Sequence, residues 1–212
     1  MERNGFDVKK KQRKSPRKPA GAALLQDSVT NAIHRALFEE WAENGYSGLR
    51  MERIAARAGV GKAALYRRSK SKLELVSEAI SAMATNITPI PDSGSFVQDV
   101  RLLMRRLAAT LRHPMVRRIL PDLHAEVARS DELVNLLAHV THDRRTQATI
   151  MIDRAIARHE LPETTDRRTI LDLLIAPLYW RLIVQRQRAT SSDIEMYANL
   201  VTRFAEGSAI DT

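Results

Sequence analysis

Apolar residues recur along this chain at the three- and four-residue spacing of an α-helix, and no stretch alternates apolar and polar residues as a half-buried strand does. The clearest stripe runs from Val29 to Trp41 at intervals of four residues, and Gly45 follows it as a stop signal. Glycine is almost confined to such boundaries. We therefore predict an all-α chain of about nine helices, in which a three-helix helix-turn-helix domain precedes a helical bundle.

Glycine, proline and capping residues divide the chain into segments. We expect Ser71 to cap the fourth helix, with Glu74 completing a capping box, and Pro121 to kink or break the sixth. A pair of prolines near residue 90 marks the boundary between two domains. After the first helix, we expect helices over residues 51–57, 61–68, 72–86, 95–112, 114–129, 131–160, 166–188 and 191–206.

The excess positive charge lies at the N-terminal end. Residues 1–72 carry 17 Lys and Arg against 7 Asp and Glu, whereas the rest of the chain carries 17 against 18. A local excess of this kind favours a polyanionic partner. We predict a disordered basic arm over residues 1–22, which is either a solubilising tail or an arm lying along a DNA groove. A DNA-binding domain over 23–86 and a second domain over 87–212 follow.

Composition and motifs argue against several classes of protein. Without cysteine the chain has no disulfide, thiolate nucleophile or cysteine-ligated zinc. No apolar run is long enough for a signal peptide or a membrane span, so we expect a cytoplasmic protein with no membrane partner. No sequence motif of a hydrolase, zinc protease or dinucleotide-binding loop occurs, so we expect neither enzymatic activity nor a cofactor. His139, His142 and Asp143 share one helix, but an exposed polar face is favoured over a metal site there.

The segment AGVGKAALYRRSKSK, residues 58–72, contains a glycine–lysine pair that allows two interpretations. A nucleotide phosphate loop needs an earlier glycine and a final hydroxyl, where this chain has Ala56 and Ala63. A helix-turn-helix motif needs two helices joined by a tight turn, and the helices expected on either side of Gly59 satisfy it. The second interpretation is therefore favoured, and the phosphates concerned are those of DNA.

The run from Ile33 to Leu75 closely resembles the DNA-binding domain of the TetR family of transcriptional regulators. The residues that carry the resemblance are Trp41, Gly45-Tyr46, Ile54-Ala55, Ala58-Gly59-Val60, Leu65-Tyr66-Arg67 and Ser71-Lys72. Together with the charge pattern, the resemblance implies that the DNA-binding residues are Arg50, Gly61, Lys62, Ala63, Ala64, Tyr66, Arg67, Arg68, Lys70 and Lys72. Hydroxyls usual in the family are missing at Leu49-Arg50, Gly61 and Ala64, and Ser69 replaces a usual aromatic.

The second half of the chain, including residues 173–181, resembles the C-terminal half of many TetR regulators. This resemblance implies a pocket for a small-molecule effector and a homodimer interface formed by the last two long helices. A two-fold dimer is also the usual way in which one recognition helix reads two half-sites. The candidate pocket residues are Leu103, Met104, Leu107, His124, Met151, Tyr179 and Trp180. Alternatively, most of them are ordinary core, and Tyr179 and Trp180 lie at the dimer interface.

These observations predict a homodimeric regulator, a ligand-responsive repressor that binds a palindromic operator in double-stranded DNA. We expect the effector to favour a conformer whose recognition helices no longer match the operator, with the helix over residues 72–86 as the hinge. Two alternatives stay open. One is a sequence-tolerant DNA-compacting protein that uses the basic arm, and the other is an enzyme that retains the helix-turn-helix for another purpose.

Overall fold

The computed structural model describes residues 21–87 and 90–207 of the chain. Within these ranges it forms nine α-helices and no strand, which confirms the predicted fold class. The expected basic arm lies outside the described residues, except that its last two residues belong to the first helix. The helices are α1 (Gly21–Gly48), α2 (Met51–Ala58), α3 (Lys62–Arg68), α4 (Lys72–Ile87), α5 (Phe96–Arg112), α6 (Pro114–Val127), α7 (Asp131–Ala157), α8 (Arg167–Tyr179) and α9 (Ser191–Gly207).

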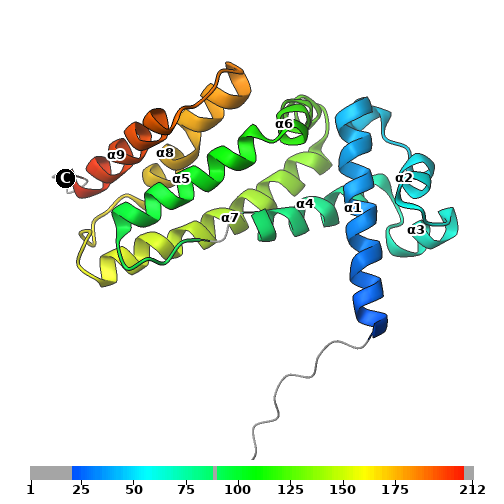
Figure 1. Ribbon diagram of the computed structural model, residues 1–212, viewed down its shortest axis with the longest axis horizontal. Helices are drawn as coiled ribbons and strands as arrows, with labels where there is room; N and C mark the ends of the chain where they lie inside the picture. The colour runs from blue at the N-terminus through cyan, green and yellow to red at the C-terminus, as the bar shows by residue number, and fades with distance from the viewer. Residues whose placement is uncertain (1–20, 88–89, 208–212) are drawn as a thin grey trace, which may run out of the picture.

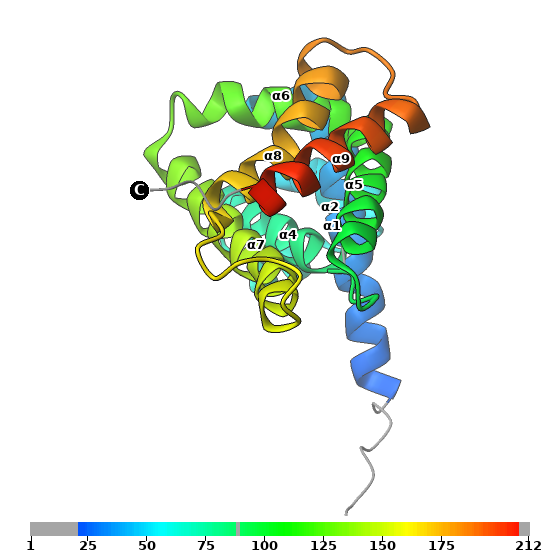
Figure 2. The same ribbon diagram turned by 90° about the vertical axis from the view of Figure 1, so that its left-hand side faces the viewer.

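The helices are arranged in two groups joined by α4 and α6 (Figures 1 and 2). Helices α1, α2 and α3 lie together at one end of the molecule, and α5, α7, α8 and α9 form a bundle at the other. Helix α6 contacts α1 on one side and α5 and α7 on the other, while α4 packs against α7. No helix within the described ranges combines the length and the apolar character needed to cross a membrane.

Two hydrophobic cores correspond to the two groups. The first surrounds the fully buried Trp41 and Leu65 and includes side chains of α1, α2, α3 and α4. Ile119 and Leu123 of α6 also belong to it. The second core is built around Met104 of α5 and takes residues from α7, α8 and α9. Since burial of apolar side chains is the main favourable term in folding, α6 and α7 connect the two groups through packing as well as through the chain.

Backbone geometry confirms the predicted signals at Gly59 and Ser71, whereas Gly45 interrupts α1, which continues to Gly48. Gly45 has φ 70° and ψ 168°, a region that is essentially restricted to glycine, and Gly59 ends α2 in the left-handed conformation with φ 69°. Ser71 accepts a hydrogen bond through Oγ from the Glu74 N–H, at 3.1 Å. The Glu74 carboxylate accepts from the Lys70 N–H instead of from the Ser71 N–H, so the capping box is displaced by one residue.

Two proline-containing helices differ from expectation, α6 in having no break and α8 in where it ends. Helix α6 is continuous from Pro114 to Val127, although Pro121 lies inside it. Pro121 lacks the N–H that would bond to the carbonyl of residue 117, but the buried residues on either side, Ile119 and Leu123, keep the helix packed. Helix α8 does not extend to residue 188. It changes at Trp180–Val184 into one π-helical turn, and the positive φ of Arg186, 54°, then ends it.

Candidate DNA-binding surface and ligand cavities

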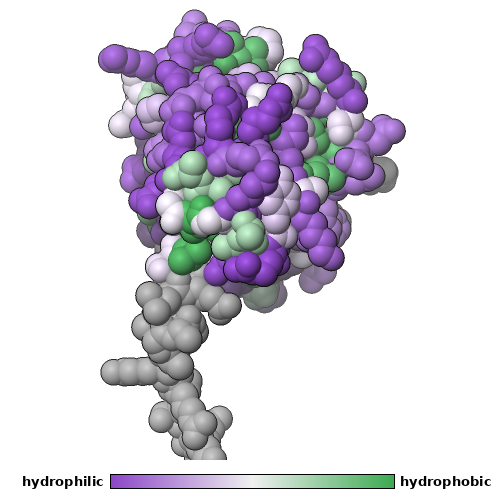
Figure 3. All heavy atoms as spheres, turned by 90° about the vertical axis from the view of Figure 1, so that its right-hand side faces the viewer, coloured by the Kyte–Doolittle hydropathy of each residue, from purple (hydrophilic) through white to green (hydrophobic). Residues whose placement is uncertain are grey.

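Helix α3 is held against the protein by one buried face and leaves the other face open. Leu65 is fully buried, whereas Lys62, Ala63, Tyr66 and Arg67 are exposed. Ala64 is only partly exposed, and Gly61 is the exposed residue that precedes the helix. The molecular face at this end is largely hydrophilic (Figure 3). Polar side chains on the open face of a second helix are what a helix-turn-helix presents to the major groove.

Two of the predicted DNA-binding side chains share one carboxylate. Lys62 Nζ lies 2.7 Å from Glu52 Oε1, and the Tyr66 hydroxyl donates to the same oxygen at 3.3 Å. The hydrogen bond between Lys62 and Glu52 lowers the pKa of the Glu52 carboxyl and raises the pKa of the Lys62 ammonium. All three side chains are exposed, so these contacts are weak. Lys62 and Tyr66 can leave Glu52 and bind another anion at little cost. Sequence reasoning missed Glu52, since no local motif places it beside Lys62.

Three further predicted residues are directed toward α1. Arg68 donates to Thr30 Oγ1 at 2.7 Å, and Arg50 donates to the carbonyl of Ser47 at 3.3 Å. Lys72 Nζ donates to the carbonyl of Tyr46 at 3.1 Å and lies 4.1 Å from the centre of its ring. Burial lowers the pKa of Lys72, with a smaller contribution from the charge of Arg50.

Arg67 and Lys70 differ from these residues in having unengaged side chains. Both are exposed, and neither side chain makes a hydrogen bond or an ion pair with any residue of the described ranges. The structure therefore separates the predicted set into free cations, at Arg67 and Lys70, and cations already held by protein groups. A cation without a protein partner breaks no existing interaction when it binds a phosphate or a base edge, so its binding costs the least free energy.

The residues that depart from the family pattern have local consequences. Arg50 and Gly61 precede α2 and α3, and neither supplies a side-chain cap. Ser69, which stands where an aromatic residue is usual, is 1% exposed, and its hydroxyl donates to Glu78 Oε2 at 2.9 Å. A hydrogen bond to α4 thus replaces aromatic packing between α3 and α4.

A polar joint connects the end of α1 to α6. Asp122 Oδ2 accepts from Trp41 Nε1 at 2.6 Å and from the Tyr46 N–H at 2.8 Å. The Ser47 hydroxyl donates to Glu126 Oε1 at 2.9 Å beside it. A Cβ atom at Gly45 would lie only 3.1 Å from Asp122 Oδ1, so the backbone approaches this carboxylate closely. We call Trp41, Tyr46 and Asp122 the α1–α6 joint.

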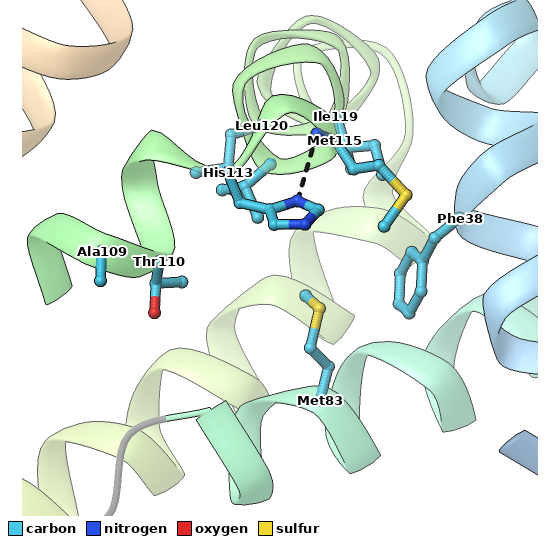
Figure 4. A pocket seen from close by; sticks show the side chains of 9 residues that line it. Phe38, Met83, Ala109, Thr110, His113, Met115, Ile119 and Leu120 are labelled. Carbon is cyan, nitrogen blue, oxygen red and sulfur yellow. Dashed lines mark hydrogen bonds between the residues drawn. The ribbon is translucent and has the colours of Figure 1, made fainter. Parts of the chain in front are cut away.

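Two apolar cavities are lined in part by α6. The first, which we call the α1-side cavity, has a volume of about 420 Å³ (Figure 4). It is lined by Phe38, Met83, Ala109, Thr110, His113, Met115, Val116, Ile119 and Leu120. The second, which we call the α7-side cavity, has a volume of about 290 Å³ and shares Met83, Thr110, Val116 and Leu120 with the first. Its other lining residues include Leu103, Leu107, Thr141, Arg144, Gln147, Leu171 and Tyr179.

The residues predicted to form an effector pocket are divided by the structure. Leu103, Leu107 and Tyr179 line the α7-side cavity. Met104 and Met151 are completely buried in the second core and do not line either cavity. His124 packs edge-on against Tyr179, with 5.6 Å between ring centres. Trp180 is 58% exposed on the molecular surface. Sequence reasoning missed Arg144 because nothing in a helical pattern distinguishes it from a solvated cation.

Two other features bear on earlier expectations. Trp180 and Val184, and likewise Met196 and Leu200 on α9, are exposed apolar pairs spaced four residues apart. Exposed apolar side chains of this size are found at protein–protein interfaces when they lie together. His139 Nε2 lies 3.4 Å from Asp143 Oδ2, and no cluster of three or more metal-ligating side chains occurs in the part of the chain that the structure describes.

Comparisons with known proteins agree with this geometry. The family model "Bacterial regulatory proteins, tetR family" matches residues 33–79, and the model "Tetracyclin repressor-like, C-terminal domain" matches residues 90–201. The chain is 27% identical over 174 residues to YdeS of Bacillus subtilis, named an uncharacterized HTH-type transcriptional regulator, and the match covers 78% of this chain and 84% of YdeS.

Solved structures show the same fold. A TetR-family regulator from Mesorhizobium loti superposes with a TM-score of 0.68 at 19% identity, covering 87% of this chain and 96% of that one. FadR from Bacillus subtilis, solved in complex with stearoyl-CoA, gives a TM-score of 0.64 at 17% identity, covering 84% of this chain and 98% of that one.

Proposed function

The chain belongs to the TetR family of transcriptional regulators, and from this premise we propose that it represses transcription as a homodimer on a palindromic operator and releases DNA when an effector binds. The observation that carries the proposal is the open face of α3, with the free guanidinium of Arg67 beside Lys62 and Tyr66. The family consists of regulators, so we also propose that the chain has no enzymatic activity. The DNA-compacting alternative has no support among the relatives.

We propose that effector binding causes DNA release through α6. Val116 and Leu120 of this helix line both cavities, and Asp122 of the same helix binds the end of α1. A ligand that displaces Val116 and Leu120 would therefore shift α6 and move Asp122. That movement would change the position of α1 and of the helix-turn-helix. Support for a small-molecule effector comes from FadR, a structural relative solved with stearoyl-CoA.

Selection of bound fragments from random DNA tests the proposed function. We expect enrichment of a palindrome whose half-sites are about one helical turn apart. In competition at one salt concentration, the enriched duplex should bind about a thousandfold or more tightly than random duplex. A ratio near one, with no enriched sequence, would favour the DNA-compacting alternative and contradict the regulator.

Arg67→Ala and Lys72→Gln are expected to affect DNA binding in different ways. Arg67 is free to reach a base edge, so its loss should relax preference at one position of each half-site, by about 1–3 kcal/mol per position. Lys72 lies beside the Tyr46 carbonyl and suits a phosphate contact, so its loss should weaken binding to all sequences and lower the salt slope by about two per dimer. Operator titrations at several salt concentrations measure both effects.

Arg154→Gln is the matched control for this pair of variants. It also removes one positive charge, but Arg154 lies on α7 and pairs with Asp92. If Arg67→Ala leaves sequence preference intact, or Lys72→Gln alters the salt slope no more than Arg154→Gln does, the residue in question does not contact DNA as proposed.

A further inference from the structure

Arg144 is a part-buried cation in the wall of an apolar cavity. Its neighbours in the α7-side cavity include Leu107, Leu171 and Leu174. No hydrogen bond or ion pair to its guanidinium occurs among the described residues. Burial lowers the pKa of Arg144, and no neighbouring charge contributes to that shift. The next residue is different, because Arg145 pairs with Asp172 at 2.6 Å.

An arginine in this environment is costly to the folded protein. A guanidinium does not lose its proton at any ordinary pH, so it cannot escape desolvation by becoming neutral. Fully buried charges are normally paired with an opposite charge, and Arg144, although only part-buried, has no such partner among the described residues. An anion bound in the cavity would supply the opposite charge that no described residue supplies.

A second cation lies in a surface hollow that adjoins the cavity. A surface hollow between α7 and α8 shares Arg145 and Leu171 with the α7-side cavity. Its other charged or titratable lining residues are His142, Arg167, Arg168 and Asp172. Two of its three arginines are paired with carboxylates, Arg145 with Asp172 and Arg167 with Asp153, and Arg168 makes no ion pair among the described residues. Arg168 is therefore the cation of this hollow that favours an anion.

We propose that Arg144 is the counter-ion for an anionic effector, an organic carboxylate whose compact apolar body fills the α7-side cavity. This inference rests on the proposed function, since it gives the chemical class of the effector. A carboxylate matches the planar guanidinium with two parallel hydrogen bonds. The cavity volume of about 290 Å³ is at the lower end of known ligand sites, which suits one ring system or a medium-length chain. The adjoining α1-side cavity gives room for a longer apolar end.

Matched probes that differ only in charge test the inference. We would measure binding of octanoate, 1-octanol and octylammonium, and of 2-naphthoate and 2-naphthol, to the full chain by calorimetry without DNA. The expected result is that at least one carboxylate binds tenfold or more tightly than its alcohol, and that octylammonium does not bind. Arg144→Gln should abolish the difference between the carboxylate and the alcohol, whereas Arg144→Lys should retain part of it.

Arg154→Gln is again the control, because this variant loses a paired, surface arginine of the same helix and should keep full discrimination. The melting temperature of ligand-free Arg144→Gln should equal or exceed that of the wild type, since the variant removes a desolvated charge. A fall of several degrees would show that Arg144 stabilises the fold and would overturn its assignment to a ligand.

Three further binding results would contradict the assignment of Arg144 to a carboxylate. Equal binding of carboxylates and alcohols, preserved discrimination in Arg144→Gln, or no binding of any carboxylate would each overturn the inference. The proposed function is tested by a different result. If carboxylates bind through Arg144 but no operator is enriched, the ligand class is supported and the proposed role as a DNA-binding regulator is contradicted. If an operator is enriched and no carboxylate binds, only the ligand class falls.

Discussion

Leu200→Glu is expected to convert the proposed dimer into a monomer and to lower operator affinity by about a hundredfold or more. A monomer binds one half-site at a time and loses the gain from binding both half-sites together. Leu200 is 53% exposed on α9 and lies one turn from Met196, which is exposed to a similar extent. We propose that these residues, with Trp180 and Val184, form the dimer interface. A carboxylate placed at the centre of an apolar interface would be buried without a partner.

Sedimentation equilibrium and operator titration measure the two consequences separately. Val134→Glu is the matched control, because Val134 is 44% exposed and apolar but lies on α7, away from the proposed interface. Val134→Glu should stay dimeric and bind operator normally. If Leu200→Glu remains a dimer at micromolar concentration, or if both variants dissociate alike, the interface lies elsewhere.

The elements that sequence reasoning predicted correctly are those set by local chemistry. Gly45 interrupts α1 and Gly59 ends α2 because their backbones adopt positive φ, and Ser71 caps α4 through a neighbour three residues away. These interactions involve residues close in sequence, so their spacing is visible in the chain itself. The open face of α3 is predictable for the same reason, since one buried Leu65 fixes which side chains point outward.

The parts that sequence reasoning did not predict depend on contacts between distant residues. Thirty-eight residues separate Arg68 from Thr30, and the carboxylate that holds Trp41 lies 81 residues further along the chain. No periodicity or motif encodes such pairs. Arg144 was missed for a related reason: its significance lies in what it lacks, and only the packed structure shows that no counter-ion reaches it among the described residues.

Asp122→Ala is expected to lower the free energy of unfolding by about 3 kcal/mol, because hydrogen bonds to a charged group contribute about 1.5–3 kcal/mol each and this carboxylate accepts two. The alanine variant leaves the Trp41 indole N–H and the Tyr46 N–H without their acceptor. Asp122→Asn keeps one carbonyl oxygen and should lose about half as much. Urea denaturation gives the free energies, and an unchanged m-value would show that the variants differ in stability and not in the surface exposed on unfolding.

Asp143→Ala is the control for the loss of a carboxylate, since Asp143 is exposed and pairs only with His139 among the described residues. A destabilisation by Asp122→Ala no larger than that of Asp143→Ala would mean that the α1–α6 joint contributes nothing.

The same joint should also influence DNA binding, because the Tyr46 residue that Asp122 holds through its N–H accepts from Lys72 through its carbonyl. Folded Asp122→Ala should therefore bind operator more weakly, and its effect should overlap with that of Lys72→Gln. In a double-mutant cycle we expect the combined loss of affinity to be smaller than the sum of the two single losses, by about 0.5 kcal/mol or more. If the two losses of affinity are strictly additive, the α1–α6 joint and Lys72 act independently. Helix α6 then does not influence DNA binding through Tyr46 and Lys72.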